Sequence, residues 1–138
     1  MSKKIFVNLP VKDLNKTVEF FTKLGYTFNP KFTNEKATCM IISENIYIML
    51  LVEPFFKSFI SKEIADTSKT TEVLIALSAD SKEHVDKLVD KATEAGGKSS
   101  RPPEDYGFMY QRSFEDLDGH IWEIGWMDSN SPDNPENK

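Results

Sequence analysis

Residues 107–126, GFMYQRSFEDLDGHIWEIGW, decide the fold, because they predict two β-strands joined by a tight turn. The pair Asp118-Gly119 is the strongest hairpin signal in the chain, since a two-residue turn needs positive φ at both central residues and Asp-Gly tolerates it. Beyond the turn, Glu123 interrupts the apolar run of residues 121–124, IWEI. Such a carboxylate lies either on the solvent-exposed face of a sheet or in a cavity, and the chemistry available to the protein depends on which of the two holds.

The composition is that of an ordinary globular chain, large enough for one compact domain or two small joined modules. The chain has 138 residues and a net charge of -5, and its Lys and Arg residues are scattered, so we expect neither a nucleic-acid nor a membrane partner. No apolar run approaches the ~20 residues of a membrane span, and residues 1–10 lack the apolar segment of a signal peptide. The single cysteine, Cys39, cannot form an internal disulfide. We therefore expect a cytoplasmic protein.

The first half of the chain predicts a strand, a helix and three further strands. Asp13 suits the N-cap of the helix, apolar residues follow at helical spacing, and Gly25 suits the position just after its end. The predicted segments are, in order, residues 5–11, 13–25, 26–32, 37–43 and 46–52.

Residues 54–71 predict a connecting segment that begins as a helix, because a proline at its start suits a first helical turn. Phe55, Phe56 and Phe59 lie close to one helical stripe. These rings either cover a cavity as a lid or pack against a second subunit.

The second half predicts the same order of elements. Residues 73–79 read as a strand, and Asp80 with Glu83 three residues later forms a plausible capping box for the next helix. The helix ends at Gly96, and the two strands of residues 107–126 follow a loop. The tail, residues 128–138, has no apolar side chain and is predicted to be disordered.

The two halves therefore form a weak internal repeat, in which Gly25 matches Gly96. A βαβββ unit has one apolar sheet face and one helix, so it cannot close a core alone. Two such units can form one curved sheet with a concave cavity between them.

This order, with the closing phrase DLDGHIWE of residues 116–123, resembles the vicinal oxygen chelate superfamily, which includes glyoxalase I, extradiol dioxygenases, fosfomycin-resistance enzymes and bleomycin-resistance proteins. The closing phrase is similar to the family's Asp-Pro-Asp-Gly-x-x-x-Glu, and LPVKDL of residues 9–14 is similar to its first strand and helix. The whole chain looks most like small bacterial proteins described as lactoylglutathione-lyase-related.

The resemblance implies an α+β fold, with two βαβββ modules forming an incomplete barrel around a concave cavity. It implies a single domain over residues 1–127, with module one at about 3–53, a linker helix at about 54–71 and module two at about 72–127. It also implies a homodimer.

In glyoxalase-type members of the family, four side chains hold a divalent ion, and the matching positions here are Phe6, Met49, Leu74 and Glu123. Phe and Leu have no donor atom, and a Met thioether suits only soft ions. We therefore expect no metal cofactor, with Zn, Ni, Mn or Fe as the disfavoured alternative.

Glu123 is the candidate catalytic residue, acting as a general base if it faces a cavity, or pairing with Arg112 as a structural ion pair if it does not. Arg112 and Tyr110 share a strand face, where Arg112 either clamps a substrate carboxylate or reaches solvent. Asn8 faces the same way as Phe6, so it either binds a ligand or is a satisfied core amide.

The candidate ligand-binding residues lie on both halves of the chain, and they are Phe6, Asn8, Met49, Tyr110 and Arg112. We expect the protein to bind a small, partly apolar organic molecule in the barrel cavity. The resemblance implies a lyase or isomerase of the glyoxalase type, although most of the metal ligands are missing. The alternatives are a ligand-sequestering, drug-resistance-type binding protein, or a metal-independent enzyme that uses Glu123.

Overall fold

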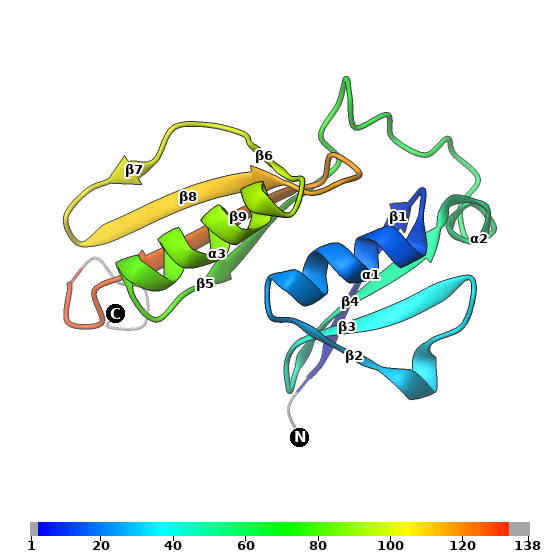
Figure 1. Ribbon diagram of the computed structural model, residues 1–138, viewed down its shortest axis with the longest axis horizontal. Coiled ribbons are helices and arrows are strands. Elements are labelled where there is room, and N and C mark those ends of the chain that lie inside the picture. The colour runs from blue at the N-terminus through cyan, green and yellow to red at the C-terminus, as the bar shows by residue number, and fades with distance from the viewer. Residues whose placement is uncertain (1–2, 133–138) are drawn as a thin grey trace. The chain divides into compact units, whose positions relative to one another are not determined.

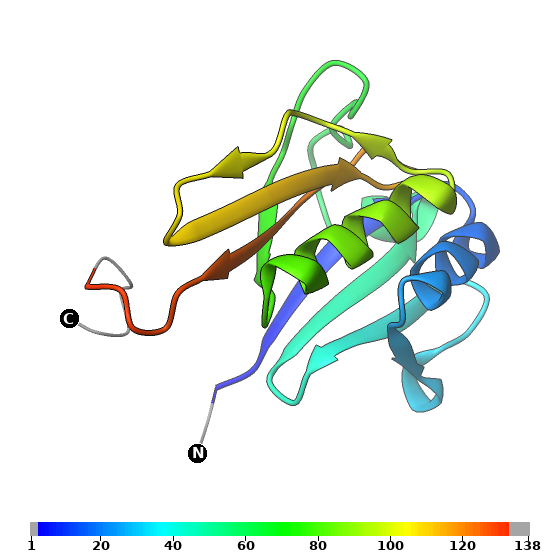
Figure 2. The same ribbon diagram turned by 60° about the vertical axis from the view of Figure 1, so that its left-hand side comes forward.

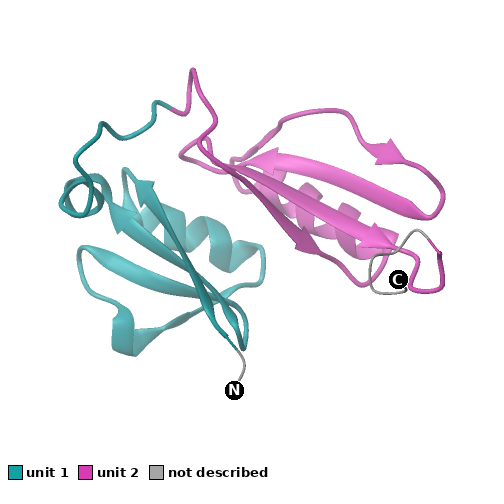
Figure 3. Cartoon of the chain, turned by 180° about the vertical axis from the view of Figure 1, so that it is seen from behind, with its two compact units in different colours: residues 1–66 teal, residues 67–138 magenta. Residues whose placement is uncertain are grey.

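The computed structural model describes residues 3–132 of the chain, which divide into two compact units (Figure 3). Unit 1 ends at Asp66 and unit 2 begins at Thr67, so the division falls inside the segment predicted as a linker. Each unit has one open sheet with a helix on one face, which confirms the α+β class. Over the described residues, no helix is both long and apolar enough to cross a membrane.

Unit 1 contains a four-stranded sheet in the order β1-β4-β3-β2 (Figure 1). β1 runs parallel to β4, and the other neighbours are antiparallel. Its elements are β1 (Ile5–Val11), α1 (Leu14–Lys23), β2 (Thr27–Asn29), the 3-10 turn η1 (Pro30–Phe32), β3 (Ala37–Ser43), β4 (Ile46–Val52) and α2 (Glu53–Lys57).

Helix α1 begins where the sequence predicts, because the Asp13 carboxylate accepts a hydrogen bond from the Lys16 amide at 3.1 Å. Gly25, with φ of 103°, follows its last turn in the left-handed conformation that glycine tolerates best. The helix buries Leu14, Thr17, Phe20 and Phe21. These side chains form a core with the inward residues of the sheet, among them Leu9, Met40, Ile48 and Leu50.

The opposite face of this sheet carries the alternate residues of the same strands. Asn8 lies beside Met49 in the parallel register of β1 and β4, and Phe6 lies beside Tyr47. The Phe6 and Tyr47 rings stack with their centroids 5.0 Å apart, and Phe6 remains 51% exposed. The predicted common orientation of Phe6 and Asn8 is therefore confirmed.

Unit 2 repeats the pattern with a sheet in the order β5-β9-β8-β6, and β7 pairs with a second part of β8. β5 runs parallel to β9, as β1 does to β4. Its elements are β5 (Leu74–Ser78), α3 (Lys82–Glu94), β6 (Lys98–Ser99), β7 (Glu104–Asp105), β8 (Met109–Glu115) and β9 (Ile121–Met127). Figure 2 shows α3 lying along its own sheet. Apolar side chains fill the space between helix and sheet, and they include Ile75, Val85, Val89, Phe114, Trp122 and Ile124.

Two local predictions differ from the structure. The N-cap of α3 is Ser81, whose hydroxyl accepts from the His84 amide, so Asp80 does not cap the helix. Helix α2 ends at Lys57, because a turn with a hydrogen bond from the Phe59 amide to the Phe56 carbonyl follows it. A helix over residues 54–71 is therefore wrong.

The structure describes only residues 128–132 of the tail, which is predicted to be disordered. Asp128 begins a turn, since its carbonyl accepts from the Ser131 amide at 3.1 Å and its carboxylate accepts from the Asn130 amide. Ser131 is buried. Residues 128–131 therefore form a hydrogen-bonded turn, residues 133–138 lie outside the described part of the chain, and the disorder of the tail stays a prediction.

Candidate functional site

The β8–β9 turn fixes the two strands that carry the candidate site, and it is wider than predicted. Five residues separate β8 from β9, and among the described residues only glycines have positive φ, so Asp118 does not adopt the conformation of a two-residue turn. Gly119 has φ of 80°, and an added Cβ would lie 2.7 Å from the Thr67 hydroxyl. Only glycine fits this position without a shift of its neighbours.

Asp116 holds the turn together from inside. Its Oδ1 accepts from the amides of Asp118 at 2.9 Å and His120 at 3.0 Å, and its Oδ2 accepts from the Trp122 indole at 2.9 Å. Burial raises the pKa of Asp116, while His120, the indole and the two amides oppose that rise. His120 is 1% exposed, and its Nδ1 lies 3.0 Å from Glu72 Oε1. The histidine thus belongs to the turn.

A cavity of about 630 Å³ lies on the face of the unit 2 sheet opposite α3. We call this face the open face of unit 2. Alternate residues of β5, β8 and β9 line the cavity, because side chains alternate between the faces of a strand. They are Ala76, Ser78, Met109, Gln111, Glu123, Gly125 and Met127. Glycine at position 125 leaves space between Glu123 and Met127 that a larger side chain would fill.

Glu123 is one of two carboxylates that line this cavity, with Asp80, and its side chain is only 13% exposed. Its Oε2 lies 2.5 Å from Arg101 Nη2, and Arg101 also pairs with Glu104 at 3.0 Å. The Tyr106 hydroxyl in turn donates to the second oxygen of Glu104 at 2.5 Å. Glu123 therefore faces a cavity, as one of the two alternatives required, and it is also ion-paired, although to Arg101 and not to Arg112.

The alternative in which Glu123 forms an ion pair with Arg112 is wrong. Arg112 pairs in register with Ile124, so it lies on the face covered by α3. There its Nη1 contacts Asp86 at 2.9 Å and Asp90 at 3.0 Å. Arg101, on a loop between β6 and β7, takes its place at Glu123. The sequence did not predict Arg101 as the partner of Glu123, because the path of the loop sets where Arg101 lies. Strand alternation shows only that Arg112 and Glu123 lie on opposite faces of the sheet.

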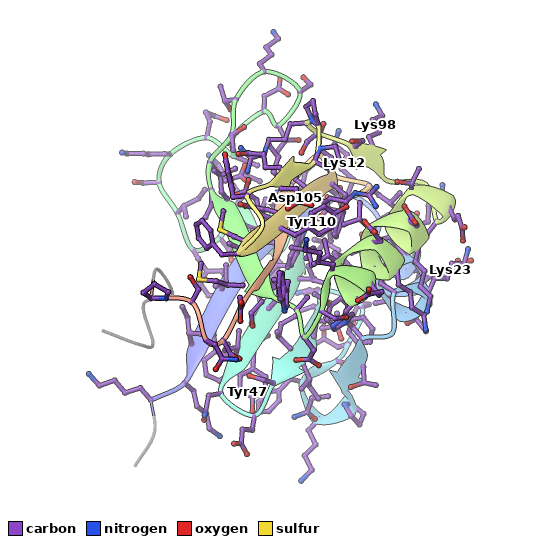
Figure 4. The ribbon with its side chains drawn as sticks, turned by 90° about the vertical axis from the view of Figure 1, so that its left-hand side faces the viewer. Lys12, Lys23, Tyr47, Lys98, Asp105 and Tyr110 are labelled. Atoms are coloured by element: carbon purple, nitrogen blue, oxygen red, sulfur yellow. The ribbon has the colours of Figure 1, made fainter. Side chains whose placement is uncertain are left out.

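Tyr110 also lies on the α3 face, where its hydroxyl donates to Asp86 at 2.6 Å. This hydrogen bond, with the Arg112 guanidinium, holds the pKa of Asp86 below its usual range. Figure 4 labels Tyr110 beside Asp105, its partner in the β7–β8 register. The structure thus places Tyr110 and Arg112 together, but not with Glu123.

The three candidate residues of unit 1 lie on the sheet face opposite α1. Asn8 donates to the Phe6 carbonyl at 3.3 Å, and it lines a cavity of about 330 Å³ together with Leu51, Phe56, Phe59 and Ile60. Phe6 and Met49 do not line this cavity. The structure therefore groups Asn8 with two of the phenylalanines that the sequence suggests as a lid.

The residues at the family's metal-ligand positions do not suit a divalent ion. Phe6 and Leu74 have no donor atom, Met49 offers only a soft thioether, and Glu123 is already paired with Arg101. Within residues 3–132, no three His, Cys, Asp or Glu side chains are grouped so that they could hold a metal ion.

Comparisons with known proteins agree with the fold. A hypothetical protein from S. aureus is 29% identical, with a TM-score of 0.77 over 91% of this chain and 94% of that chain. A glyoxalase/bleomycin resistance protein/dioxygenase family enzyme from Burkholderia phytofirmans is 18% identical, with a TM-score of 0.75 over 91% of this chain and 99% of that one. The fosfomycin resistance protein FosX from Listeria monocytogenes is 21% identical, with a TM-score of 0.65 over 91% and 93% of the two chains.

No protein with a curated description matches the chain. The family model of the Glyoxalase/Bleomycin resistance protein/Dioxygenase superfamily matches residues 5–124, which include both units and the turn between β8 and β9. The chain therefore belongs to the glyoxalase/bleomycin resistance protein/dioxygenase superfamily.

Proposed function

We propose that this protein binds a small, partly apolar organic molecule in the cavity on the open face of unit 2, without a divalent metal. One observation carries the proposal. The cavity of about 630 Å³ combines apolar Met109, Met127 and Gly125 with the polar groups of Gln111 and Glu123. A pocket of a few hundred Å³ with few, well-placed polar groups is typical of small-molecule sites.

The position of Glu123 favours binding over catalysis. A general base must reach the proton that it removes, and one carboxylate oxygen of Glu123 is held by Arg101 at 2.5 Å. The same ion pair keeps the acidic group in a fixed place, which suits recognition. Sequestration of a ligand without turnover is therefore the first form of the proposal. The likeness to fosfomycin resistance proteins, at 15% and 21% identity, supports the fold and does not select the ligand.

A metal-independent enzyme is the second form. The observation in its favour is that Glu123 lines the cavity with only 13% of its side chain exposed. If a ligand displaces Arg101, the carboxylate becomes able to take a proton from that ligand.

Equilibrium dialysis against a mixture of small metabolites, followed by mass spectrometry, tests the proposal. The matched control is Gly125→Leu, because a Cβ at this position meets only the Tyr110 carbonyl at 3.9 Å and Gln111 Cγ at 4.0 Å, both ordinary contacts. The added side chain occupies part of the cavity between Glu123 and Met127 and leaves the strand intact. We expect the wild-type protein to retain at least one compound that Gly125→Leu does not.

The fate of that compound separates the two forms. A retained compound that is unchanged after long incubation, with or without chelator, supports sequestration. Conversion that stops in Glu123→Gln while binding persists supports the enzyme. Equal retention by wild type and Gly125→Leu, or no retention by either, contradicts a ligand in this cavity.

A further inference from the structure

The cavity of unit 2 is acidic. The ionisable residues among those that line it are Asp80 and Glu123, and both are carboxylates. Lys82 does not line the cavity and pairs with Asp105 at 3.4 Å. Its ammonium also lies 5.6 Å from the centroid of the Trp126 ring, so one cation-binding face of that ring is already taken. Asp80 and Glu123 are therefore the lining residues that determine which ligand charge the cavity favours.

Arg101 shows what kind of group Glu123 accepts. Its guanidinium sits on the cavity-facing carboxylate at 2.5 Å, and it is shared with Glu104, so two carboxylates compete for one cation. Arg101 is 44% exposed and is held to the strand by these contacts, not by burial. Because the Arg101 guanidinium is partly exposed and shared with Glu104, a second cation that enters the cavity can take its place on Glu123.

We propose that the ligand is an organic cation, a primary amine or guanidine attached to an apolar body, whose charged group replaces Arg101 on Glu123. This inference rests on the proposed function. When the ligand enters, Arg101 stays paired with Glu104, and no buried charge is left without a partner. The apolar body lies against Met109 and Met127, whose flexible thioether side chains adapt to irregular shapes. The net charge of -5 favours the approach of cations.

Three probes of one shape and different charge test the inference. They are protonated 1-naphthylmethylamine, neutral 1-naphthylmethanol and anionic 1-naphthoate. Binding is followed by NMR of methyl-labelled methionines, in which Met109 and Met127 report the cavity. Met40, which is fully buried in unit 1, serves as the internal reference.

We expect the amine to shift the signals of Met109 and Met127 at concentrations about tenfold lower than the neutral probe, which corresponds to about 1.4 kcal/mol from a charged hydrogen bond. Glu123→Gln should remove this preference. Arg101→Gln should strengthen amine binding about two- to fivefold, since it removes the internal competitor. The matched control is Glu115→Gln, a carboxylate on the neighbouring strand β8 that shares the sheet face of Glu123 and lies outside the cavity lining, and it should leave the preference unchanged.

Failure of this inference is distinguishable from failure of the proposed function. Equal or tighter binding of the neutral or anionic probe, or no binding by any of the three, overturns the choice of a cation. A compound retained in the dialysis experiment would still support a ligand site. Weaker amine binding in Arg101→Gln would also overturn the inference, because it would mean that Arg101 helps to hold the ligand.

Discussion

Asp116 holds the turn between β8 and β9, the two strands that carry Glu123 and most of the cavity lining, and the loss of stability on its removal can be estimated. Asp116→Ala removes the acceptor of three hydrogen bonds, from the amides of Asp118 and His120 and from the Trp122 indole. The Asp118 amide belongs to a turn beside Leu117, which is 42% exposed, so water can replace that bond. His120 and Trp122 are each only 1% exposed.

Two buried donors are therefore left without their acceptor. Each unsatisfied buried group lowers the free energy of unfolding by about 1–3 kcal/mol. Part of this loss is offset, because the substitution also removes a buried carboxylate that is itself unfavourable to bury. We expect Asp116→Ala to lower the free energy of unfolding of unit 2 by about 3 kcal/mol. With a urea dependence of roughly 2 kcal/mol per M, the unfolding midpoint moves down by about 1.5 M.

The assay is urea unfolding followed by tryptophan fluorescence. The chain has two tryptophans, Trp122 and Trp126, and both lie in unit 2, so the signal reports the unit that carries the substitution. Asp116→Asn is the matched control, because its amide oxygen can still accept from the two turn amides. It should cost about 1 kcal/mol, the contribution of the one lost indole bond. A cost below about 1 kcal/mol for Asp116→Ala would refute the role assigned to this carboxylate.

Three further predictions follow from the same structure. Gly125→Ala should leave the fold intact and raise the stability of unit 2 by roughly 0.5 kcal/mol in the urea assay, because a strand glycine is costly and the added Cβ meets only ordinary contacts; a clear loss of stability would contradict this. Asp86 has a lowered pKa in the fold, so its stabilising effect is present at neutral pH and is lost as the pH falls below about 4. Unfolding measured against pH should therefore show a smaller loss of stability in acid for Asp86→Asn than for the wild type. Parallel curves would contradict the pairing with Arg112. Asp13→Ala should destabilise unit 1 by about 1 kcal/mol through loss of the α1 cap, measured by the thermal transition in circular dichroism, and no change would mean that the cap contributes little.

The fold could be predicted from the sequence because both halves carry strong periodic patterns. Strands β1, β3 and β4 have the bounds that their β-rich sequences predict, and the glycines after both long helices have positive φ. The capping of α3 could not be predicted with equal certainty, since Asp80 and Ser81 are adjacent and both suit the position.

The candidate site could be predicted only as far as strand alternation reaches. Alternation places Glu123 on one face of β9 and separates Tyr110 and Arg112 from the residues on the other face of β8. It gives no information on Arg101, because the loop between β6 and β7 has no periodicity. The expected homodimer and cytoplasmic location stay predictions.

The most direct test of the central claim is the NMR titration of the wild-type protein and Gly125→Leu with 1-naphthylmethylamine. The account predicts that Met109 and Met127 shift together in the wild type while Met40 does not, and that these shifts become much smaller when the leucine obstructs the cavity. Shifts of the same size in Gly125→Leu, or shifts confined to Met40 or Met49 of unit 1, would contradict a small-molecule site on the open face of unit 2.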